Sequence, residues 1–370
     1  MALPARDEAA TVDAAVAALA DQRDFAGRAF DPERYEVVVL ANNCGDDTAA
    51  AARAAGAAAR RRAPGFRLHV VEAWLAPGEA HSGGARRRAM ELAHARVRAA
   101  RDALGATPAA GVLATTDADT VVAPDWLAAT LAEFAAGADA VGGRVVAARL
   151  DALPAAARGL YLYDVGYRHL VAAVDALFDP EPHDPWPRHH QHFGASLAVT
   201  ADAYARVGGM PGVGALEDVR LYEALVRAGL RVRHSPRVRA ATSARASGRA
   251  RVGLATQIAE WAGAGGRWPV ESAAFVERWA RTRATLRELW AGRLPGELDA
   301  LAAALCLTPD TLAGAAHVRR PFGAFLLDAD LRGRFARAWD ARRFGPAHED
   351  VRAAVRGLRS RVAALRGAAR

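Results

Sequence analysis

Residues 111–120 read GVLATTDADT. The apolar half of this stretch predicts a buried strand, and Asp117 and Asp119 follow where that strand ends. Alternation in an extended segment would point both carboxylates to the same side, where they could share a hard divalent cation and a diphosphate. A solvated loop whose carboxylates cap the next helix explains the same pattern equally well.

Strand and helix patterns alternate at short spacing on both sides of this stretch. Such alternation argues for an α/β fold with a mostly parallel sheet that is covered by helices on both faces. From about residue 255 onward the pattern is helical, with breaks at glycine and proline. The predicted strands are residues 1–4, 35–41, 67–72, 111–114, 138–147, 193–200, 231–234 and 237–242.

Composition describes a globular chain and excludes several classes of protein. Of the 370 residues, 52% are hydrophobic, and all 49 basic positions are arginine, for a net charge of +8. Cys44 and Cys306 have no metal-ligand spacing, so neither a disulfide framework nor a zinc site is expected. No apolar run approaches the ~18 residues that span a bilayer, and the N-terminus has no apolar signal core. We expect a cytoplasmic protein that is either free in solution or peripheral to a membrane.

Polar clusters follow the predicted strands and should lie side by side at the ligand-binding edge of the sheet. The amide of Asn42 can read a base, and Asp46 can bond either its own loop or a ribose hydroxyl. Asx-turn and helix-capping roles explain Asn43, Asp46 and Thr48 equally well. Residues 83–88 bring glycines and guanidinium groups to a helix N-terminus, which suits phosphate oxygens, although a solvated basic face fits as well.

Five motifs follow one another along the chain, namely residues 4–8 (PARDE), 42–48 (NNCGDDT), 84–86 (GAR), 116–119 (TDAD) and 208–211 (GGMP) with 217–218 (ED). In this order they resemble the motifs of family 2 glycosyltransferases with the GT-A fold, of the non-processive bacterial type. Each motif alone is weak, and the resemblance, which covers roughly residues 1–253, depends on their order. It implies a GT-A domain at residues 1–265, with a nucleotide-binding half at 1–147 and an acceptor half at 148–265, followed by a helical region at 266–370.

The resemblance also implies roles for single residues. Asp119 and Asp117 would hold Mg²⁺ or Mn²⁺, which neutralises the departing nucleoside diphosphate. Asp218 would remove the proton of the acceptor hydroxyl in an inverting reaction, with Glu217 as an orienting neighbour; helix N-terminal charge is the competing explanation of both. The residues implied to bind the nucleotide-sugar donor are Pro4, Arg6, Glu8, Asn42, Asp46, Gly84, Arg86, Asp117, Ala118, Arg245 and Arg249.

Departures from the family pattern limit the function. The Q-x-x-R-W signature and the membrane helices of processive synthases are absent, so we expect transfer of one sugar to an acceptor that is a small molecule, a glycan or a lipid-linked group. Arg245 and Arg249 could bind the departing diphosphate from a closing loop, or could belong to an ordinary surface loop. The alternatives are a retaining GT-A transferase, a nucleotide-sugar-binding protein without turnover and, from charge alone, a nucleic-acid binder.

Two further regions carry open interpretations. The histidines could supply a third metal ligand, shape an acceptor pocket together with aromatic residues, or lie in a solvated proline-rich loop. Residues 350–370 form a basic amphipathic pattern that either touches anionic lipid or packs on the protein. An apolar series from Trp268 to Trp290 is expected to be core. The residues of the first region are His183, His189, His190, His192 and His234, with Trp186, Tyr161, Tyr163 and Tyr167.

Overall fold

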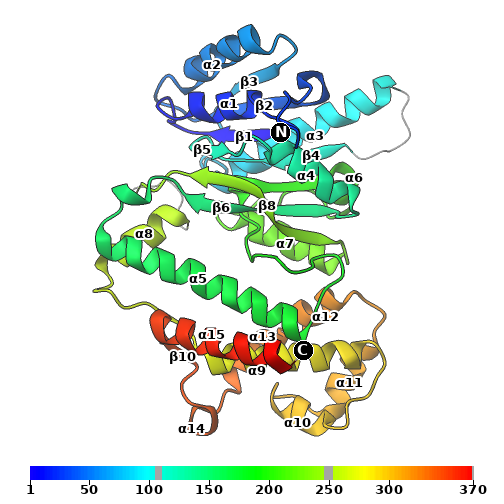
Figure 1. Cartoon of the computed structure of the whole chain (residues 1–370). Helices are drawn as coiled ribbons and strands as arrows, with labels where there is room; N and C mark the ends of the chain where they lie inside the picture. Colours follow the sequence, from blue (N-terminus) through cyan, green and yellow to red (C-terminus); the bar gives the residue numbers. More distant parts are fainter. Residues whose placement is uncertain (105–110, 246–252, 369–370) are drawn as a thin grey trace. The chain divides into compact units, whose positions relative to one another are not determined.

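The computed structural model of the chain describes residues 1–104, 111–245 and 253–368 (Figure 1). The chain forms two compact units. The first unit contains Met1–Ala152, Gln191–Leu225 and Leu230–Gln257, and the second contains Leu153–His190, Val226–Gly229 and Ile258–Arg370. The predicted domain boundary at residue 265 stays a prediction.

An eight-stranded mixed sheet forms the centre of the first unit, in the order β3-β2-β1-β4-β7-β6-β8-β5. The neighbours β1, β2, β3 and β4 run parallel, as do β6 and β8, whereas β7 and β5 pair antiparallel with their neighbours. This arrangement confirms the predicted α/β class with a mostly parallel sheet. The strands are β1 (Ala2–Ala5), β2 (Glu36–Asn42), β3 (Arg67–Ala73), β4 (Val112–Thr115), β5 (Thr120–Val122), β6 (Ala140–Ala147), β7 (Leu197–Thr200) and β8 (Val232–Thr242).

Helices cover this sheet because the central strands are apolar on both faces. Val37 and Val39 of β2 are fully buried in one core with Val16 and Ala52, while Leu40 is fully buried as well. Figure 1 shows the helices around the sheet. They are α1 (Val12–Ala20), α2 (Thr48–Arg62), α3 (Ser82–Leu104), α4 (Trp126–Ala135), α6 (Ala201–Arg206) and α7 (Glu217–Arg227), with the 3-10 turns η1 (Pro32–Arg34), η2 (Leu150–Ala152) and η3 (Gly194–Ser196).

Three details of the sheet differ from the prediction. The two strands predicted at residues 231–234 and 237–242 are one strand, β8. Its register with β6 shifts between Gly143 and Arg144, which pair with Ser235 and Arg239, so residues 236–238 have no partner in the register and the strand continues past them. The short strand β5 directly follows Asp119, where we expected only a loop before the next helix. The front of the predicted 193–200 strand is the turn η3.

The second unit is helical, with one two-stranded antiparallel sheet. Phe275, Trp279 and Leu286 are buried in its core, which confirms that the apolar series is a packing stripe. None of the helices in the described part of the chain combines the length and apolar character needed to cross a bilayer. The elements are α5 (Ala155–Phe178), α8 (Leu254–Gly263), β9 (Pro269–Glu271), α9 (Ala273–Trp290), α10 (Leu298–Ala303), α11 (Pro309–His317), α12 (Phe322–Asp328), α13 (Leu331–Arg337), α14 (Ala341–Phe344), β10 (His348–Asp350) and α15 (Val351–Ala368).

The basic C-terminal helix α15 packs on the protein. Val351, Ala354, Val355 and Leu358 are between 0% and 3% exposed, so its apolar face is already covered within the unit. An amphipathic helix needs that face free to insert into a lipid surface. The structure therefore favours the packed alternative for residues 350–368.

A buried ionic network ties the proline-rich segment after α5 to α9. The Asp179 carboxylate, 3% exposed, accepts from Arg287 Nη2 at 2.9 Å and lies 3.0 Å from Arg283 Nε. Burial alone would raise the pKa of Glu181, but a hydrogen bond with His183 and the guanidinium groups of Arg283 and Arg287 hold it well below its usual range. These charges compensate one another in the interior of the unit.

The substitution Asp179→Asn should lower the free energy of unfolding by about 3 kcal/mol or more, because it leaves buried arginine charge uncompensated. The matched control is Glu288→Gln, which removes one partner of the exposed pair with Arg293 and should leave stability unchanged. Urea unfolding followed by circular dichroism measures both. Equal effects of the two variants would show that the network does not stabilise the unit.

Candidate active site

Loops that follow three parallel strands meet at one edge of the sheet. In-register pairing of β1 with β2, and of β1 with β4, puts the carboxyl ends of these strands side by side. The loops after them carry residues 6–8, 42–48 and 117–119. The strand alternation in the sequence therefore predicted correctly that these loops lie at one edge of the sheet, which is the edge where open α/β sheets bind ligands.

The buried guanidinium of Arg86 joins segments that are far apart in the sequence. It is 6% exposed, and Nε donates to Glu217 Oε1 at 2.8 Å while Nη2 donates to Asp117 Oδ1 at 2.8 Å. Nη1 donates to Thr115 Oγ1 and to the carbonyl of Gly194, both at 3.0 Å. Arg86 thus links Asp117 and Glu217, from two of the predicted motifs, through one side chain.

Local sequence explains how Arg86 reaches this position. Helix α3 starts at Ser82, so Arg86 lies in its first turns rather than in a flexible loop. A Cβ on Gly83 would lie 2.1 Å from the carbonyl oxygen of Val213 and 3.3 Å from Glu217 Oε2, so glycine permits the close approach of α3 to the start of α7. The predicted phosphate contact of Arg86 stays a prediction, because here its guanidinium bonds protein groups.

Asp218 lies beside this cluster at the start of α7. Its Oδ2 accepts from the backbone N–H of Gly194 and its Oδ1 from that of Val219, both at 2.8 Å. Burial raises the pKa of Asp218 above the ordinary aspartate value, against the opposing charge of Arg86. Leu216, just before the helix, has a φ of 59°, which costs energy for a bulky side chain and is common at functional sites.

The two aspartates of the D-x-D sequence lie in a turn, not in an extended strand. The N–H of Thr120 donates to the carbonyl of Asp117 at 3.1 Å, which closes the turn between β4 and β5. Our alternation argument assumed extended backbone and therefore does not apply. The carboxylates bond different arginines, since Asp117 contacts Arg86 whereas Asp119 Oδ2 lies 3.1 Å from Arg245.

Arg245 and Glu8 complete the surroundings of Asp119. Nη1 of Arg245 donates to Glu8 Oε2 at 3.0 Å, and Nη2 bonds the other oxygen of the same carboxylate. Burial, together with the negative charges of Asp117 and Glu8 and against the charge of Arg245, raises the pKa of Asp119 to about 6. Arg249, the other arginine predicted for this loop, lies outside the described residues.

The carboxylates of Glu8, Asp117 and Asp119 suit a divalent cation. Their oxygens are the ligands that Mg²⁺ and Mn²⁺ prefer, and burial, followed by the negative charges of Asp117 and Glu8, raises the pKa of Asp119 although Arg245 is present. The chemistry of these side chains therefore suits the predicted metal, and the assignment of Asp119 and Asp117 as its protein ligands stays a prediction.

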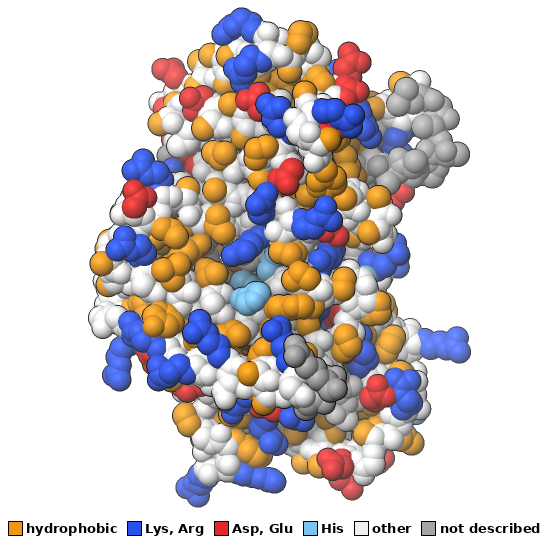
Figure 2. Space-filling model, viewed as in Figure 1, with side chains coloured by type: hydrophobic (Ala, Val, Ile, Leu, Met, Phe, Trp, Pro, Cys, Tyr) orange, Lys and Arg blue, Asp and Glu red, His pale blue; other side chains and the backbone are white. Residues whose placement is uncertain are grey.

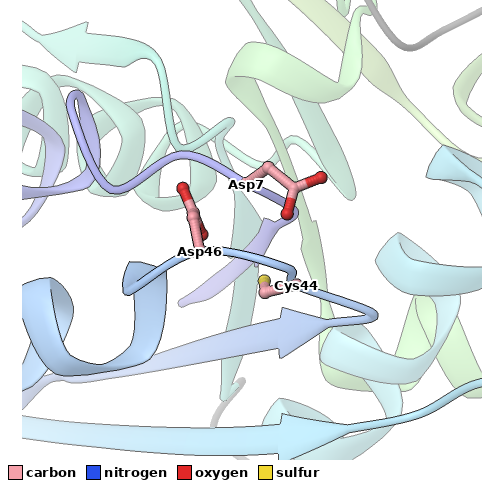
Figure 3. Close-up of side chains that lie close together, drawn as sticks. All are labelled: Asp7, Cys44 and Asp46. Carbon is pink, nitrogen blue, oxygen red and sulfur yellow. The ribbon is translucent and has the colours of Figure 1, made fainter.

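A second acidic group lies in the neighbouring loops (Figure 3). Ligand atoms of Asp7, Cys44 and Asp46 lie within 4.8 Å of one another. The two carboxylates already hold the loops together, because Asp7 Oδ1 accepts from the N–H of Gly45 at 2.6 Å and Asp46 Oδ2 from the N–H of Ala9 at 3.1 Å. Asp46 Oδ1 also accepts from the N–H of Thr48 at 3.0 Å, so Asp46 bonds its own loop, which was one of its two interpretations.

Donor binding by the remaining predicted residues stays a prediction. Asn42 is only 2% exposed, so the reading of a base by its amide stays a prediction. Nη1 of Arg6 donates to the carbonyl of Ala80 at 3.0 Å and so connects this edge to the loop before α3. The others are Gly84 in the first turn of α3, Pro4 within β1 and Ala118 in the turn after β4.

His192 and His234 form an aromatic cluster with Tyr222, one helical turn beyond Asp218. The rings of His192 and Tyr222 stack at 4.0 Å with an interplanar angle of 6°, and His234 lies 5.6 Å from Tyr222. Sequence reasoning did not identify Tyr222 as part of this cluster. Its i+4 spacing from Asp218, which puts both residues on one face of the helix, was the feature that could have indicated it.

The strand register separates His234 from the D-x-D turn. His234 pairs with Gly142, and Thr242, which donates to Asp119, pairs with Ala147. Those positions on β6 are five residues apart, or about 17 Å of strand. His234 is therefore a poor candidate for a third ligand beside Asp119.

The aromatic residues of the second unit divide between core and surface. Tyr161 and Tyr167 are 7% and 6% exposed, and the Tyr167 hydroxyl donates to the carbonyl of Glu271, so these rings are packing residues rather than an acceptor surface. Tyr163 is 40% and Trp186 is 37% exposed.

Comparisons with known proteins give remote likenesses. No protein-family model and no curated protein matches the sequence. Among solved structures, the chain aligns with the mannosyltransferase PcManGT from Pyrobaculum calidifontis in complex with GDP-Man and Mn²⁺, at a TM-score of 0.43 and 19% identity, over 90% of this chain and 86% of that one.

Two mycobacterial structures align over shorter spans. Glucosyl-3-phosphoglycerate synthase from Mycobacterium tuberculosis, in complex with Mn²⁺, UDP and phosphoglyceric acid, gives a TM-score of 0.35 at 17% identity, over 62% of this chain and 65% of that one. Another mycobacterial protein gives 0.35 at 19% identity, over 65% and 63% of the two chains. The chain thus spans just under two thirds of the length of both. TM-scores this low do not support a function for this chain, so its function is inferred from the geometry of the site.

Proposed function

We propose that this chain is a metal-dependent glycosyltransferase of the GT-A type, which moves a single sugar from a nucleotide-sugar to an acceptor hydroxyl with inversion. The observation that carries the proposal is the Arg86 cluster. Asp117 lies 31 residues and Glu217 lies 131 residues from Arg86 in the sequence, yet both contact its guanidinium. The guanidinium of Arg86 therefore connects the D-x-D turn, which is proposed to bind the donor, to Glu217 and Asp218, which are proposed to lie at the acceptor.

The roles of the residues follow from their surroundings. Asp119 and Asp117 would hold Mg²⁺ or Mn²⁺, and the bound cation would neutralise the charge that develops on the leaving nucleoside diphosphate. Asp218 is the base. As the acceptor oxygen forms its bond to the anomeric carbon, that carbon's bond to the diphosphate oxygen breaks, its electron pair leaves with the diphosphate, and the hydroxyl proton moves to Asp218. Two backbone N–H groups orient the Asp218 carboxylate.

A thermal-shift screen tests the proposal. Nucleoside diphosphates and nucleotide-sugars, with GDP-mannose and UDP-glucose among them, are added with Mn²⁺, with Mg²⁺ or with EDTA. We expect one nucleotide class to raise the melting temperature only in the presence of metal, since a ligand at 100 times its Kd stabilises by about 2.7 kcal/mol. Failure of every nucleotide to shift the transition with either metal would contradict a donor site.

Product analysis separates this proposal from its alternatives. NMR of the anomeric centre distinguishes inversion from retention, and donor binding without turnover on a broad acceptor panel would indicate a binding protein. On the face shown in Figure 2, the arginines drawn in blue are scattered among acidic and apolar side chains, and the described residues there form no continuous basic stripe. Such a stripe is what a nucleic-acid backbone requires.

A further inference from the structure

The hydrogen bonds of Arg86 use nearly all that a guanidinium can donate. The group has five N–H donors, and bonds to four different residues use four of them. The side chain is 8% exposed, and its charge is balanced by the carboxylates of Asp117 and Glu217. A phosphate ligand would have to displace bonds that already compensate a buried charge, which is costly.

Two of the hydrogen bonds of Arg86 go to residues that contact or adjoin Asp218. The carbonyl of Gly194 accepts from Arg86, while the N–H of the same residue donates to Asp218 Oδ2. Glu217, which also accepts from Arg86, directly precedes Asp218 in the chain. The place of the Asp218 carboxylate therefore depends on the guanidinium through two independent paths.

The turn that carries Gly194 is also held by hydrogen bonds from two other residues. Thr116 Oγ1 donates to the carbonyl of Ala195 at 2.9 Å, and Nε1 of the buried Trp126 donates to Ser196 Oγ at 2.8 Å. A Cβ on Gly194 would lie 2.3 Å from Cζ of Arg86, so only glycine admits the guanidinium at this point. Arg86 thus fills a fitted space between the D-x-D turn and the start of α7.

We propose that Arg86 is a positioning residue for the reaction, which fixes the Asp218 carboxylate relative to the D-x-D turn through Gly194 and Glu217 and does not bind the phosphates of the donor. The inference rests on the proposed function, because it assigns Arg86 a part in the same transfer. It replaces the phosphate role that the sequence pattern suggested for this residue.

The kinetics of the Arg86→Met variant distinguish a positioning role for Arg86 from a role in binding the phosphates of the donor. We expect kcat to fall by about 10²-fold, the size of effect that misplacement by about 1 Å produces. The Kd of the donor nucleotide with Mn²⁺, measured by calorimetry without acceptor, should change by less than about 5-fold, because less than 1 kcal/mol of binding energy is lost. Arg86→Lys should recover part of kcat. A donor Kd weakened as much as kcat falls would overturn the proposal.

A double-mutant cycle tests whether Arg86 acts through Asp218. In an Asp218→Asn background, Arg86→Met should slow the residual transfer by less than 3-fold, because residues that act as a unit are not additive. An undiminished 10²-fold loss in that background would show that Arg86 acts elsewhere. Arg98→Met is the control, since Arg98 is exposed on the same helix, twelve residues beyond Arg86.

Gly194→Ala gives an independent variant if Arg86→Met fails to fold. The added methyl group pushes the guanidinium without removing its charge, so kcat should again fall by about 10²-fold while donor affinity is kept. Full activity of Gly194→Ala would overturn the proposal. Absence of metal-dependent nucleotide binding by the wild-type chain would instead contradict the proposed function, so the two failures are distinguishable.

Discussion

Replacing Asp119 by alanine should abolish metal-dependent donor binding and slow sugar transfer by about 10³-fold, because a bound metal contributes several kcal/mol of transition-state stabilisation. Asp119 is mostly buried beside Glu8 and Arg245, and burial is the main reason that its pKa lies near 6. Without this carboxylate, Arg245 would keep its bonds to Glu8, and a bound cation would lack one of the two carboxylates proposed to hold it.

Calorimetry of Mn²⁺ and nucleotide binding, together with a transfer assay, measures this effect. Asp125→Asn is the matched control, since Asp125 lies six residues on, at the start of α4, and contacts Arg239 at 3.3 Å rather than the site. We expect the control to bind and transfer normally. An Asp119→Ala protein that retained metal-dependent donor binding at wild-type affinity would place the metal elsewhere.

Replacing Asp218 by asparagine should lower kcat by about 10²- to 10⁴-fold, the usual contribution of a general base, and should leave donor affinity nearly unchanged. Asparagine keeps one acceptor oxygen for the N–H of Gly194 or Val219, so the loss reports proton transfer rather than collapse of the turn. Asp202→Asn, an exposed substitution at the start of α6, is the control and should transfer sugar at the wild-type rate.

The pH profile gives a second measurement of the same base. Burial raises the pKa of Asp218, so its carboxylate takes up a proton at a higher pH than an exposed aspartate does. Transfer should therefore fall on the acid side at a pH above the ordinary aspartate value, and the residual activity of Asp218→Asn should lack this acid limb. Saturating metal and donor keep Asp119, the other carboxylate with a raised pKa, ionised during this assay. Under that condition, a wild-type acid limb that persisted unchanged in Asp218→Asn would assign the base to another group.

Much of the framework was predictable because it depends on local patterns. Val37 to Leu40 form a strand from β-branched and apolar residues, and the acidic start of α7 and the long α5 follow from periodicity. Parallel strands then bring their following loops to one edge, so Asp117 and Asn42 could be placed near each other without a structure. The errors occurred where a turn interrupts the pattern, as at Asp119 and Thr120.

The amino-acid pattern was enough to predict the alternation of strands and helices, the edge of the sheet that carries the polar loops and the kinds of side chain available there. Which charges pair became visible only in the folded chain. Arg86, predicted from its place at a helix N-terminus to contact phosphate, bonds Glu217 from 131 residues away, and Arg245 bonds Glu8 from 237 residues away. The periodicity of a segment reports which face is buried, whereas the partner of a buried charge depends on how distant segments pack around it, and no local pattern encodes that choice.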